Sequence, residues 1–354
     1  MGLDLSMNYK EIVLRRLWSQ GLSSGRFSSA EEVVRWMGCV QAQDFGMAKR
    51  GVEMRVAGAF SSGAVAVDAA YNAGTILRTH VLRPTWHFVL PADIGWMLRL
   101  SAPRIRAFSK PYHRQLSLDP AVFRRSRRVL EKALADGVFL TRAEIVTLFK
   151  EVKIDTSDIR MNFLLMDAEL EGLICSGPRR GKQFTYALLA DRVVRLSDLS
   201  GDEALGELAR RYFVSRGPAT VNDLAWWGGM TLGDARRGLE VVKGELECVV
   251  VDGVAYWAGA SVSAPGFSST SVILLPAFDE LTVAYKDRSA ILPVEYAKAS
   301  SYGLKPVIVV NGRIVGIWRR VTVKGKVVVE PQFFEKVGKA VLRLVEGGCK
   351  SWGK

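Results

Sequence analysis

Two glutamines separated by one residue, Gln41-Ala42-Gln43, are the residues of this chain whose type and spacing best suit chemistry. The apolar pattern before them predicts a helix that ends at Gln41. Residues i and i+2 do not face each other within a helix. The two neutral amides therefore converge only where the chain leaves the helix and extends, as at Phe45-Gly46. Such paired amides suggest chemistry on a bound partner rather than binding alone.

Two adjacent carboxylates form a second candidate. Asp279 and Glu280 follow the apolar run 275–278 and can serve as the acid and the base of a hydrolase. The charged run 286–288 lies close behind them and favours an ion-pair network that neutralises both carboxylates. The sequence therefore favours a structural role for Asp279 and Glu280.

The cysteines and histidines lack the spacing of a metal site. The four cysteines form no C-x-x-C pair, which is typical of reduced thiols in a cytoplasmic protein. The three histidines are not spaced as zinc ligands. We therefore expect neither a metal nor any other cofactor.

Length and charge indicate a multi-part protein that binds a polyanion. A chain of 354 residues is too long for one ordinary compact core, so two or three subdomains are expected. Its formal net charge of +13 attracts nucleic acid first, and an anionic membrane or ribosomal contact after that. The N-terminus shows no signal-peptide pattern, and no apolar run is long enough to span a bilayer.

The predicted elements repeat one layout three times without repeating its sequence. Each unit has short helices followed by a two-stranded hairpin, which is the layout of a winged helix: a helix-turn-helix with a wing. The hairpin turns are marked by Arg83-Pro84, by the run 177–182 and by Asp252-Gly253. Besides the helix that ends at Gln41, the predicted helices span residues 9–20, 65–73, 92–106, 141–149, 159–171, 203–215, 221–227 and 232–243.

The composition changes to β from Ser271 onward. Strands are predicted over 272–275, 305–310, 314–319 and 326–329, with Asn311-Gly312 as the strongest hairpin signal. A closing helix is predicted over 333–346. The expected fold class is α+β. The expected domains are a first winged helix with the glutamine motif (1–117), a second (118–200), a third (201–262) and a C-terminal β-rich segment (263–354).

Basic residues gather in the second unit where a winged helix meets nucleic acid. Arg179, Arg180 and Lys182 form a hairpin tip that can enter a minor groove or cover phosphates. Hairpin tips are also charged simply because they are solvated. Arg124 and Arg128 lie on an arginine-rich helix and have the donor geometry for phosphate, while a solvated helix face is an equal alternative.

The first hairpin is rich in groups that stack or donate hydrogen bonds. Trp86 can stack on a base, and His80 or His87 can reach a phosphate or a substrate. Arg78 and Arg83 add two further donors to the predicted DNA-binding set. Packing of Trp86 in the core, with a histidine satisfied internally, is an equal alternative for each residue taken singly.

Four blocks, in this order along the chain, together resemble the bacterial AlkZ/YcaQ-type winged-helix DNA glycosylases. The resemblance runs from about residue 9 to about residue 330. The catalytic signature of that family is Gln-hydrophobic-Gln in one branch, with Asp in place of the second Gln in the other. Gln41 and Gln43 fill both positions of the first form. The blocks are Gln41-Ala42-Gln43, residues 78–87, residues 215–220, and the segments 275–280 and 285–288.

The resemblance implies three winged helices around a C-shaped cleft for duplex DNA, and excision of bulky N-alkylated purines, including both ends of an interstrand crosslink. An N7-alkylated guanine already carries positive charge, so it leaves without a strong general acid. Gln41 and Gln43 are then expected to hold the nucleophilic water and to stabilise the oxocarbenium-like sugar. A tethered base cannot swing fully into a pocket, so an open cleft suits this substrate. Asp44, directly after the motif, is a third catalytic candidate.

Two interpretations follow. The first is a metal-free, monofunctional DNA glycosylase of base-excision repair, acting as a monomer on double-stranded DNA in the cytoplasm, at the nucleoid, with no membrane partner. The second is a non-catalytic winged-helix DNA-binding protein, such as a transcriptional regulator. Regulators usually dimerise on a palindrome, and the sequence shows neither a coiled coil nor a ligand domain. The glutamine pair favours the enzyme, although buried amides also serve as structural hydrogen-bond hubs.

Overall fold

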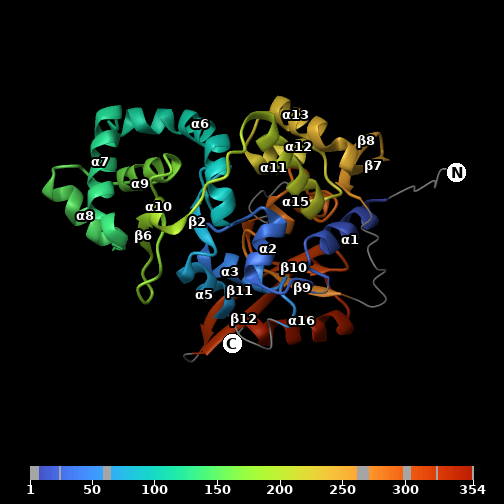
Figure 1. The fold of residues 1–354 in the computed structure, drawn as a ribbon. Coiled ribbons are helices and arrows are strands. Elements are labelled where there is room, and N and C mark those ends of the chain that lie inside the picture. The colour runs from blue at the N-terminus through green and yellow to red at the C-terminus, as the bar shows by residue number, and fades with distance from the viewer. Residues whose placement is uncertain are drawn as a thin grey trace.

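A computed structural model of the chain describes residues 8–23, 25–58, 65–260, 271–297, 304–323 and 326–352. The described residues form both helices and strands, as expected for an α+β fold (Figure 1). Within the described residues, no helix combines the length and the apolar character that crossing a membrane requires.

The first unit joins helices to an antiparallel sheet with the strand order β1-β3-β2. The helix predicted to reach Gln41 ends at Met37, because Gly38 takes a φ of 75° that favours glycine. The chain then enters a strand, in which residues i and i+2 share a face. The helix predicted over 92–106 continues to Gln115. The elements are α1 (Tyr9–Ser19), α2 (Ala30–Met37), β1 (Cys39–Gln41), α3 (Phe45–Glu53), α5 (Val65–Ala73), β2 (Leu77–His80), β3 (Trp86–Val89) and α6 (Pro91–Gln115).

The second unit forms the lobe of α7, α8 and α9 at the left of Figure 1. A capping box opens α8: Thr141 N–H donates to the Glu144 carboxylate at 2.7 Å, and Glu144 N–H donates to the Thr141 hydroxyl at 3.3 Å. The elements are α7 (Pro120–Ala133), β4 (Leu140–Thr141), α8 (Arg142–Glu151), α9 (Arg160–Leu170), β5 (Ile174–Ser176), β6 (Thr185–Leu188) and α10 (Leu189–Arg192).

The third unit packs two helices closely against each other. Gly238 permits this approach, because a Cβ at that position would lie 2.6 Å from the Leu205 carbonyl oxygen. The predicted hairpin with its turn at Asp252-Gly253 is confirmed. The elements are α11 (Gly201–Arg216), α12 (Val221–Gly228), α13 (Leu232–Val242), β7 (Leu246–Val251) and β8 (Val254–Gly259).

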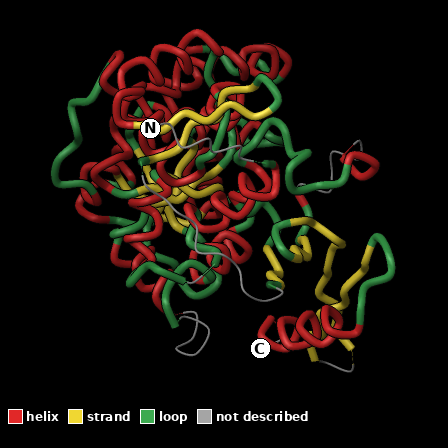
Figure 2. The backbone as a smooth tube through the Cα atoms, turned by 90° about the vertical axis from the view of Figure 1, so that its right-hand side faces the viewer, coloured by secondary structure: helices red, strands yellow, loops and turns green. Residues whose placement is uncertain are grey.

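The C-terminal segment is an antiparallel sheet with the order β12-β11-β10-β9, covered by α16 (Figure 2). The predicted closing helix begins later than expected, because Phe333 still pairs with Gly316 at the end of β12. The other face of the sheet packs on α1 through Val13 and Leu17. The elements are β9 (Val272–Leu275), α14 (Glu280–Val283), α15 (Val294–Ala297), β10 (Val307–Val310), β11 (Arg313–Val323), β12 (Lys326–Phe333) and α16 (Lys339–Trp352).

One hydrophobic core joins the first unit to the third. Cys39 of β1 and Met97 of α6 belong to the same buried cluster as Tyr212 of α11 and Trp227 of α12. The neighbouring Val40 and Ala42 point into a different cluster, formed within the first unit. Strand β1, which carries the glutamine motif, is therefore held between two cores.

Candidate active site and nucleic-acid interface

Gln41 is fixed at both its side chain and its backbone. It ends β1 opposite His87 of β3 and is 7% exposed. Its side-chain oxygen accepts a hydrogen bond from Arg83 Nη2 at 2.8 Å. Its backbone N–H donates to Glu280 Oε1 at 2.8 Å. The orientation of the Gln41 amide is therefore set by Arg83, and the end of β1 is anchored on Glu280.

Gln43 lies at the exposed edge of the same sheet. Its side-chain oxygen accepts from the backbone N–H of Trp86 at 3.3 Å, and its backbone oxygen accepts from Arg78 Nη2 at 3.3 Å. The side-chain oxygens of Gln41 and Gln43 thus both accept hydrogen bonds from the stretch 83–86, which leads into β3. A carbonyl oxygen has two lone pairs, so each can still accept a hydrogen bond from a water molecule.

Asp44 caps a helix. Its Oδ1 accepts a hydrogen bond from Met47 N–H at 3.0 Å at the start of α3, and the residue is exposed. A cap of this kind satisfies one of the orphan donors of a helix N-terminus. This contact gives the carboxylate after the motif a structural role as a helix cap.

A buried ion pair between Arg216 and Glu280 lies beneath the motif. Glu280 Oε2 accepts hydrogen bonds from Arg216 Nη2 at 2.6 Å, from Arg216 Nε at 3.0 Å and from Trp227 Nε1 at 3.1 Å. Arg216 also donates to the carbonyl oxygens of Met37 and Cys39, on either side of Gly38. Burial alone would raise the pKa of Glu280, but Arg216 and the Gln41 N–H hold that pKa below its ordinary value.

Asp279 has a buried arginine of its own. Arg55 contacts it through two hydrogen bonds, at 2.8 Å and 3.0 Å. The expectation that the run 286–288 neutralises the two carboxylates is therefore wrong. The backbone N–H groups of Lys286 and Asp287 bond to Asp223 instead. The true partners lie far away in sequence, so adjacency along the chain did not reveal them.

The first hairpin stacks its polar and aromatic groups on one another. The Arg78 guanidinium lies 4.3 Å from the Trp86 ring centroid, and Arg78 Nε donates to the Ala42 carbonyl oxygen at 3.0 Å. The His80 ring lies 4.5 Å from the Trp86 ring. His80 Nδ1 lies 2.5 Å from Glu169 Oε2, on α9 of the second unit. These contacts clamp the hairpin between the motif and α9.

His87, which the sequence predicts to contact DNA, is fully buried and does not reach the surface. Its Nδ1 lies 2.9 Å from the Thr85 carbonyl oxygen. Burial, reinforced by the charge of Arg83, holds the pKa of His87 well below its ordinary value. The ring is therefore neutral and donates from Nδ1 to Thr85. Its location between strands, rather than at the hairpin turn, is what the sequence pattern did not show.

The family model for DNA glycosylase AlkZ-like proteins matches residues 34–349. The chain belongs to the AlkZ-like DNA glycosylase family. An interstrand DNA cross-link repair glycosylase from Streptomyces sahachiroi is 26% identical over 335 residues, which cover 89% of this chain and 88% of that protein. The solved structure of Streptomyces sahachiroi DNA glycosylase AlkZ matches with a TM-score of 0.78 at 24% sequence identity, over 97% of this chain and 95% of that one. The two proteins share a fold.

Among the described residues of this AlkZ-like protein, only some of the basic side chains predicted to contact DNA lack an ion-pair partner. Arg124 and Arg128 are exposed on α7, and Lys182 is exposed on the β5–β6 hairpin; the described residues supply no ion-pair partner for any of the three. Arg180, in contrast, pairs with Glu144 Oε1 at 2.7 Å. Arg179 lies 3.6 Å from Asp68.

Phe184, which the sequence analysis did not single out, connects the two hairpins. The Arg78 guanidinium lies 5.2 Å from its ring centroid, and the Arg179 guanidinium lies 5.3 Å from it. Phe45 of α3 packs edge-on against the same ring at 5.1 Å. The second hairpin therefore meets the glutamine site. A lone phenylalanine within a strand pattern carries no signal of this long-range contact.

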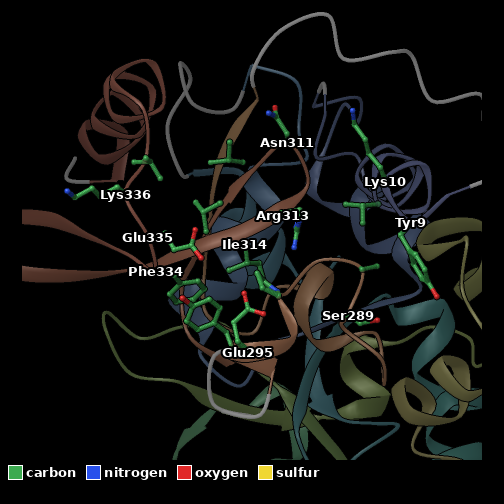
Figure 3. A pocket seen from close by; sticks show the side chains of 17 residues that line it. Tyr9, Lys10, Ser289, Glu295, Asn311, Arg313, Ile314, Phe334, Glu335 and Lys336 are labelled. Atoms are coloured by element: carbon green, nitrogen blue, oxygen red, sulfur yellow. The ribbon is translucent and has the colours of Figure 1, made fainter.

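Two cavities formed by described residues lie away from the motif. One, of about 1080 Å³, lies between α1 and the β10–β11 turn and is lined by Tyr9, Lys10, Arg313 and Phe334 among others (Figure 3). Another, of about 880 Å³, lies beside α7 and includes Arg124. Neither is lined by Gln41 or Gln43. Gln43 is exposed at the surface, whereas Gln41 is buried. Within the described ranges, no cluster of His, Cys, Asp and Glu side chains could hold a metal ion.

Proposed function

We propose that this protein is a monofunctional glycosylase that hydrolyses the N-glycosidic bond of bulky N-alkylated purines in base-excision repair. The observation that carries the proposal is the placement of both motif amides on the stretch 83–86 by hydrogen bonds from Arg83 and from Trp86 N–H. The curated relative named as an interstrand DNA cross-link repair glycosylase supports crosslinks as substrates. The exposed position of Gln43 suits a base that stays tethered to the opposite strand.

The reaction needs positioning more than acid catalysis. An N7-alkylated guanine leaves with the electron pair of the C1′–N9 bond, which neutralises its positive charge. The sugar then carries oxocarbenium character, which the carbonyl dipoles of Gln41 and Gln43 stabilise. Gln43, the exposed member, holds the attacking water through its second lone pair. Arg83 fixes the direction of the Gln41 carbonyl, so the dipole is in place before the substrate arrives.

We propose that the three helix–hairpin units are winged helices that surround duplex DNA in a C-shaped arrangement, with the protein acting as a monomer at the nucleoid in the cytoplasm. The proposed domains are 1–117, 118–200, 201–262 and the C-terminal segment 263–354. The order of helices and hairpin within each unit supports this division. The proposed DNA contacts are Arg78, His80, Arg83, Trp86, Arg124, Arg128, Arg179, Arg180 and Lys182.

Single-turnover base release tests the function directly. Wild-type protein is incubated with duplexes carrying N7-methylguanine, a bulkier N7 adduct or an interstrand crosslink, and abasic sites are revealed by alkali. The matched control is the double variant Gln41→Ala/Gln43→Ala. We expect alkali-labile sites with wild type, none above background with the control, and duplex binding by both. Binding without base release from any adduct would favour the DNA-binding protein, and strand breaks without alkali would contradict a monofunctional enzyme.

Lys182→Ala is expected to weaken duplex binding and to reduce the slope of log K against log salt concentration by about 0.9, the contribution of one phosphate contact. Lys182 is exposed at the hairpin tip and has no ion-pair partner among the described residues. Lys10→Ala, on α1 beside the cavity of Figure 3, is the control and should leave the slope unchanged. Equal slopes for Lys182→Ala and wild type would remove Lys182 from the interface.

Asp44→Asn is expected to keep base release within about threefold of wild type, because asparagine caps a helix about as well as aspartate. Asp44→Ala should lower the free energy of unfolding by about 1 kcal/mol through loss of the cap. Denaturant unfolding and single-turnover kinetics measure the two effects separately. If Asp44→Asn is as slow as Gln43→Ala, the carboxylate is catalytic and the cap alone does not explain it.

A further inference from the structure

Arg288 is a half-buried arginine with no carboxylate partner among the described residues. Its Nε donates to the Thr282 carbonyl oxygen at 2.6 Å, at the end of α14. This neutral acceptor fixes the position of the guanidinium but leaves its charge unbalanced. The acidic neighbour in the sequence, Asp287, accepts from the backbone N–H of Ser289 at 2.8 Å instead.

A second arginine in the same state lies nearby. Arg83, which orients the Gln41 amide, is also half-buried and has no ion-pair partner within the part of the chain that the structure describes. Its Nε is buried and finds no hydrogen-bond acceptor there. Burial, and then the charge of Arg83, lower the pKa of Arg288, so the two guanidinium groups are close enough to repel each other.

The end of α12 borders both arginines. The indole N–H of Trp226 donates at 3.2 Å to the backbone carbonyl next to the one that accepts from Arg288. Three residues on, Gly229 packs against the first hairpin, where a Cβ would lie 3.0 Å from Cγ of Arg83. Trp226 is 46% exposed, so this border reaches the molecular surface.

The Gln41 amide faces the same region. Cys39 points into the core that β1 shares with α11 and α12, and Gln41, two residues on, points to the same side of the strand. Arg83 contacts the Gln41 side chain on that side, and Glu280 of α14 holds the Gln41 backbone. A partner bound by both arginines therefore lies beside the Gln41 amide.

Two half-buried guanidinium groups close together favour an anion between them. Like charges at short range raise the free energy of the folded protein, and partial burial adds a desolvation cost. The carboxylates of α12 and α14 already have partners. Glu280 is bonded to Arg216 and Trp227, and Asp223 accepts from two backbone N–H groups of the run 286–288. In a protein that binds DNA the anion is a phosphate, whose geometry matches the donor fork of arginine.

We propose that Arg83 and Arg288 together bind one phosphate of the DNA strand that carries the lesion; this proposal rests on the glycosylase function proposed above. The phosphate flanks the lesion nucleotide, because Arg83 also bonds to Gln41. Arg288 offers its two Nη groups, since its Nε is held by the Thr282 carbonyl. The bound phosphate balances both charges and holds the lesion sugar beside the Gln41 amide.

The test is a cycle of binding measurements that combines protein variants with neutral phosphates. Affinity is measured for N7-methylguanine duplexes with an uncharged methylphosphonate at either phosphate flanking the lesion, or at one remote phosphate. A 2′-fluoro group on the lesion sugar suppresses base loss during binding. Wild type should lose about tenfold in affinity at one flanking position, as expected for one hydrogen bond to a charged group. Arg288→Gln should bind the all-phosphate duplex about tenfold more weakly and lose nothing further at that position, because the contact is already gone.

Arg313→Gln is the matched control, since Arg313 is an exposed arginine in the cavity of Figure 3, away from the motif. It should keep the wild-type loss at the flanking position. If Arg288→Gln also keeps that loss, any weaker binding is structural and the phosphate contact is disproved, while the glycosylase function stands. Wild type that loses no affinity at either flanking position overturns the proposal as well.

Base release from the duplex without fluorine separates the two proposals. Wild type that shows the flanking loss in binding but releases no base overturns the glycosylase function and leaves the phosphate contact in place. Thermal melting checks the fold of each variant. If Arg288→Gln does not fold, the same cycle with Arg288→Lys decides. Lysine keeps one charge without the fork, so the loss at the flanking position should shrink, and an unchanged loss contradicts the proposal.

Discussion

Gln43→Ala is expected to slow base release from an N7-alkylguanine duplex by about 10²- to 10³-fold, the loss typical of removing one positioned polar group from a transition state. Gln43 is the exposed member of the pair, and its carbonyl oxygen retains a free lone pair after bonding to Trp86 N–H. Truncation removes the group that holds the water. The fold should change little, because the side chain lies at the edge of the sheet.

The measurement is single-turnover kinetics with duplex binding measured in parallel. Gln115→Ala, an exposed glutamine at the end of α6, is the matched control and should behave as wild type. Gln43→Asp should retain more activity than Gln43→Ala, because a carboxylate oxygen also accepts a hydrogen bond from water. If Gln43→Ala and Gln115→Ala release base at equal rates, the motif is a structural hub and the proposed mechanism fails.

Local signals explain which elements the sequence could predict. Thr141, Thr220 and Thr231 each cap a helix with their own side chain, as their spacing to an acidic residue or to an apolar run predicts. The turns at Asp252-Gly253 and Asn311-Gly312 are likewise local. The short strand β1 was missed because three residues carry too little pattern, and the apolar run before it continues the helical period.

The sequence predicted only part of the site, because the contacts that hold the site together are long-range. Gln41 and Gln43 stand out by their spacing, but the groups that hold them are distant along the chain. Glu280 reaches the Gln41 N–H across 239 positions, and Glu169 reaches His80 across 89. Such partners are brought together by the packing of whole units, and no window of sequence contains both.

Counting basic residues in the sequence also overestimates how many of them are available to bind DNA. Arg180 and Arg127 look equivalent to Lys182 and Arg124 in the sequence. The structure pairs Arg180 with Glu144, and Arg127 with Asp167 and Glu171. An arginine in an ion pair must exchange its partner to bind phosphate, so its net contribution to DNA affinity is smaller than that of a free cation. Fewer basic side chains therefore contribute fully to DNA affinity than the count of basic residues indicates.

Arg216→Met is expected to lower the free energy of unfolding by about 3–5 kcal/mol, because it leaves the carboxylate of Glu280 buried without its counter-ion. Both side chains of the pair are fully buried, and Arg216 also holds the carbonyl oxygens of Met37 and Cys39. The end of β1 then loses its support, so base release should fall together with stability. Denaturant unfolding at neutral pH measures the first effect, and single-turnover kinetics the second.

The pH dependence and two further variants make this prediction specific. Because the folded pKa of Glu280 lies below its ordinary value, the stability contributed by its pairing is present above the unfolded pKa and is lost as pH falls through the folded pKa. The loss of unfolding free energy in Arg216→Met should therefore shrink in acid, where Glu280 in the variant becomes neutral.

The double variant Arg216→Met/Glu280→Leu should recover part of the lost unfolding free energy, since it removes both charges. Arg237→Met, at a surface pair in which Arg237 is 57% exposed, should cost less than about 1 kcal/mol. Equal losses for Arg216→Met and Arg237→Met would mean that the buried pair does not anchor the glutamine strand.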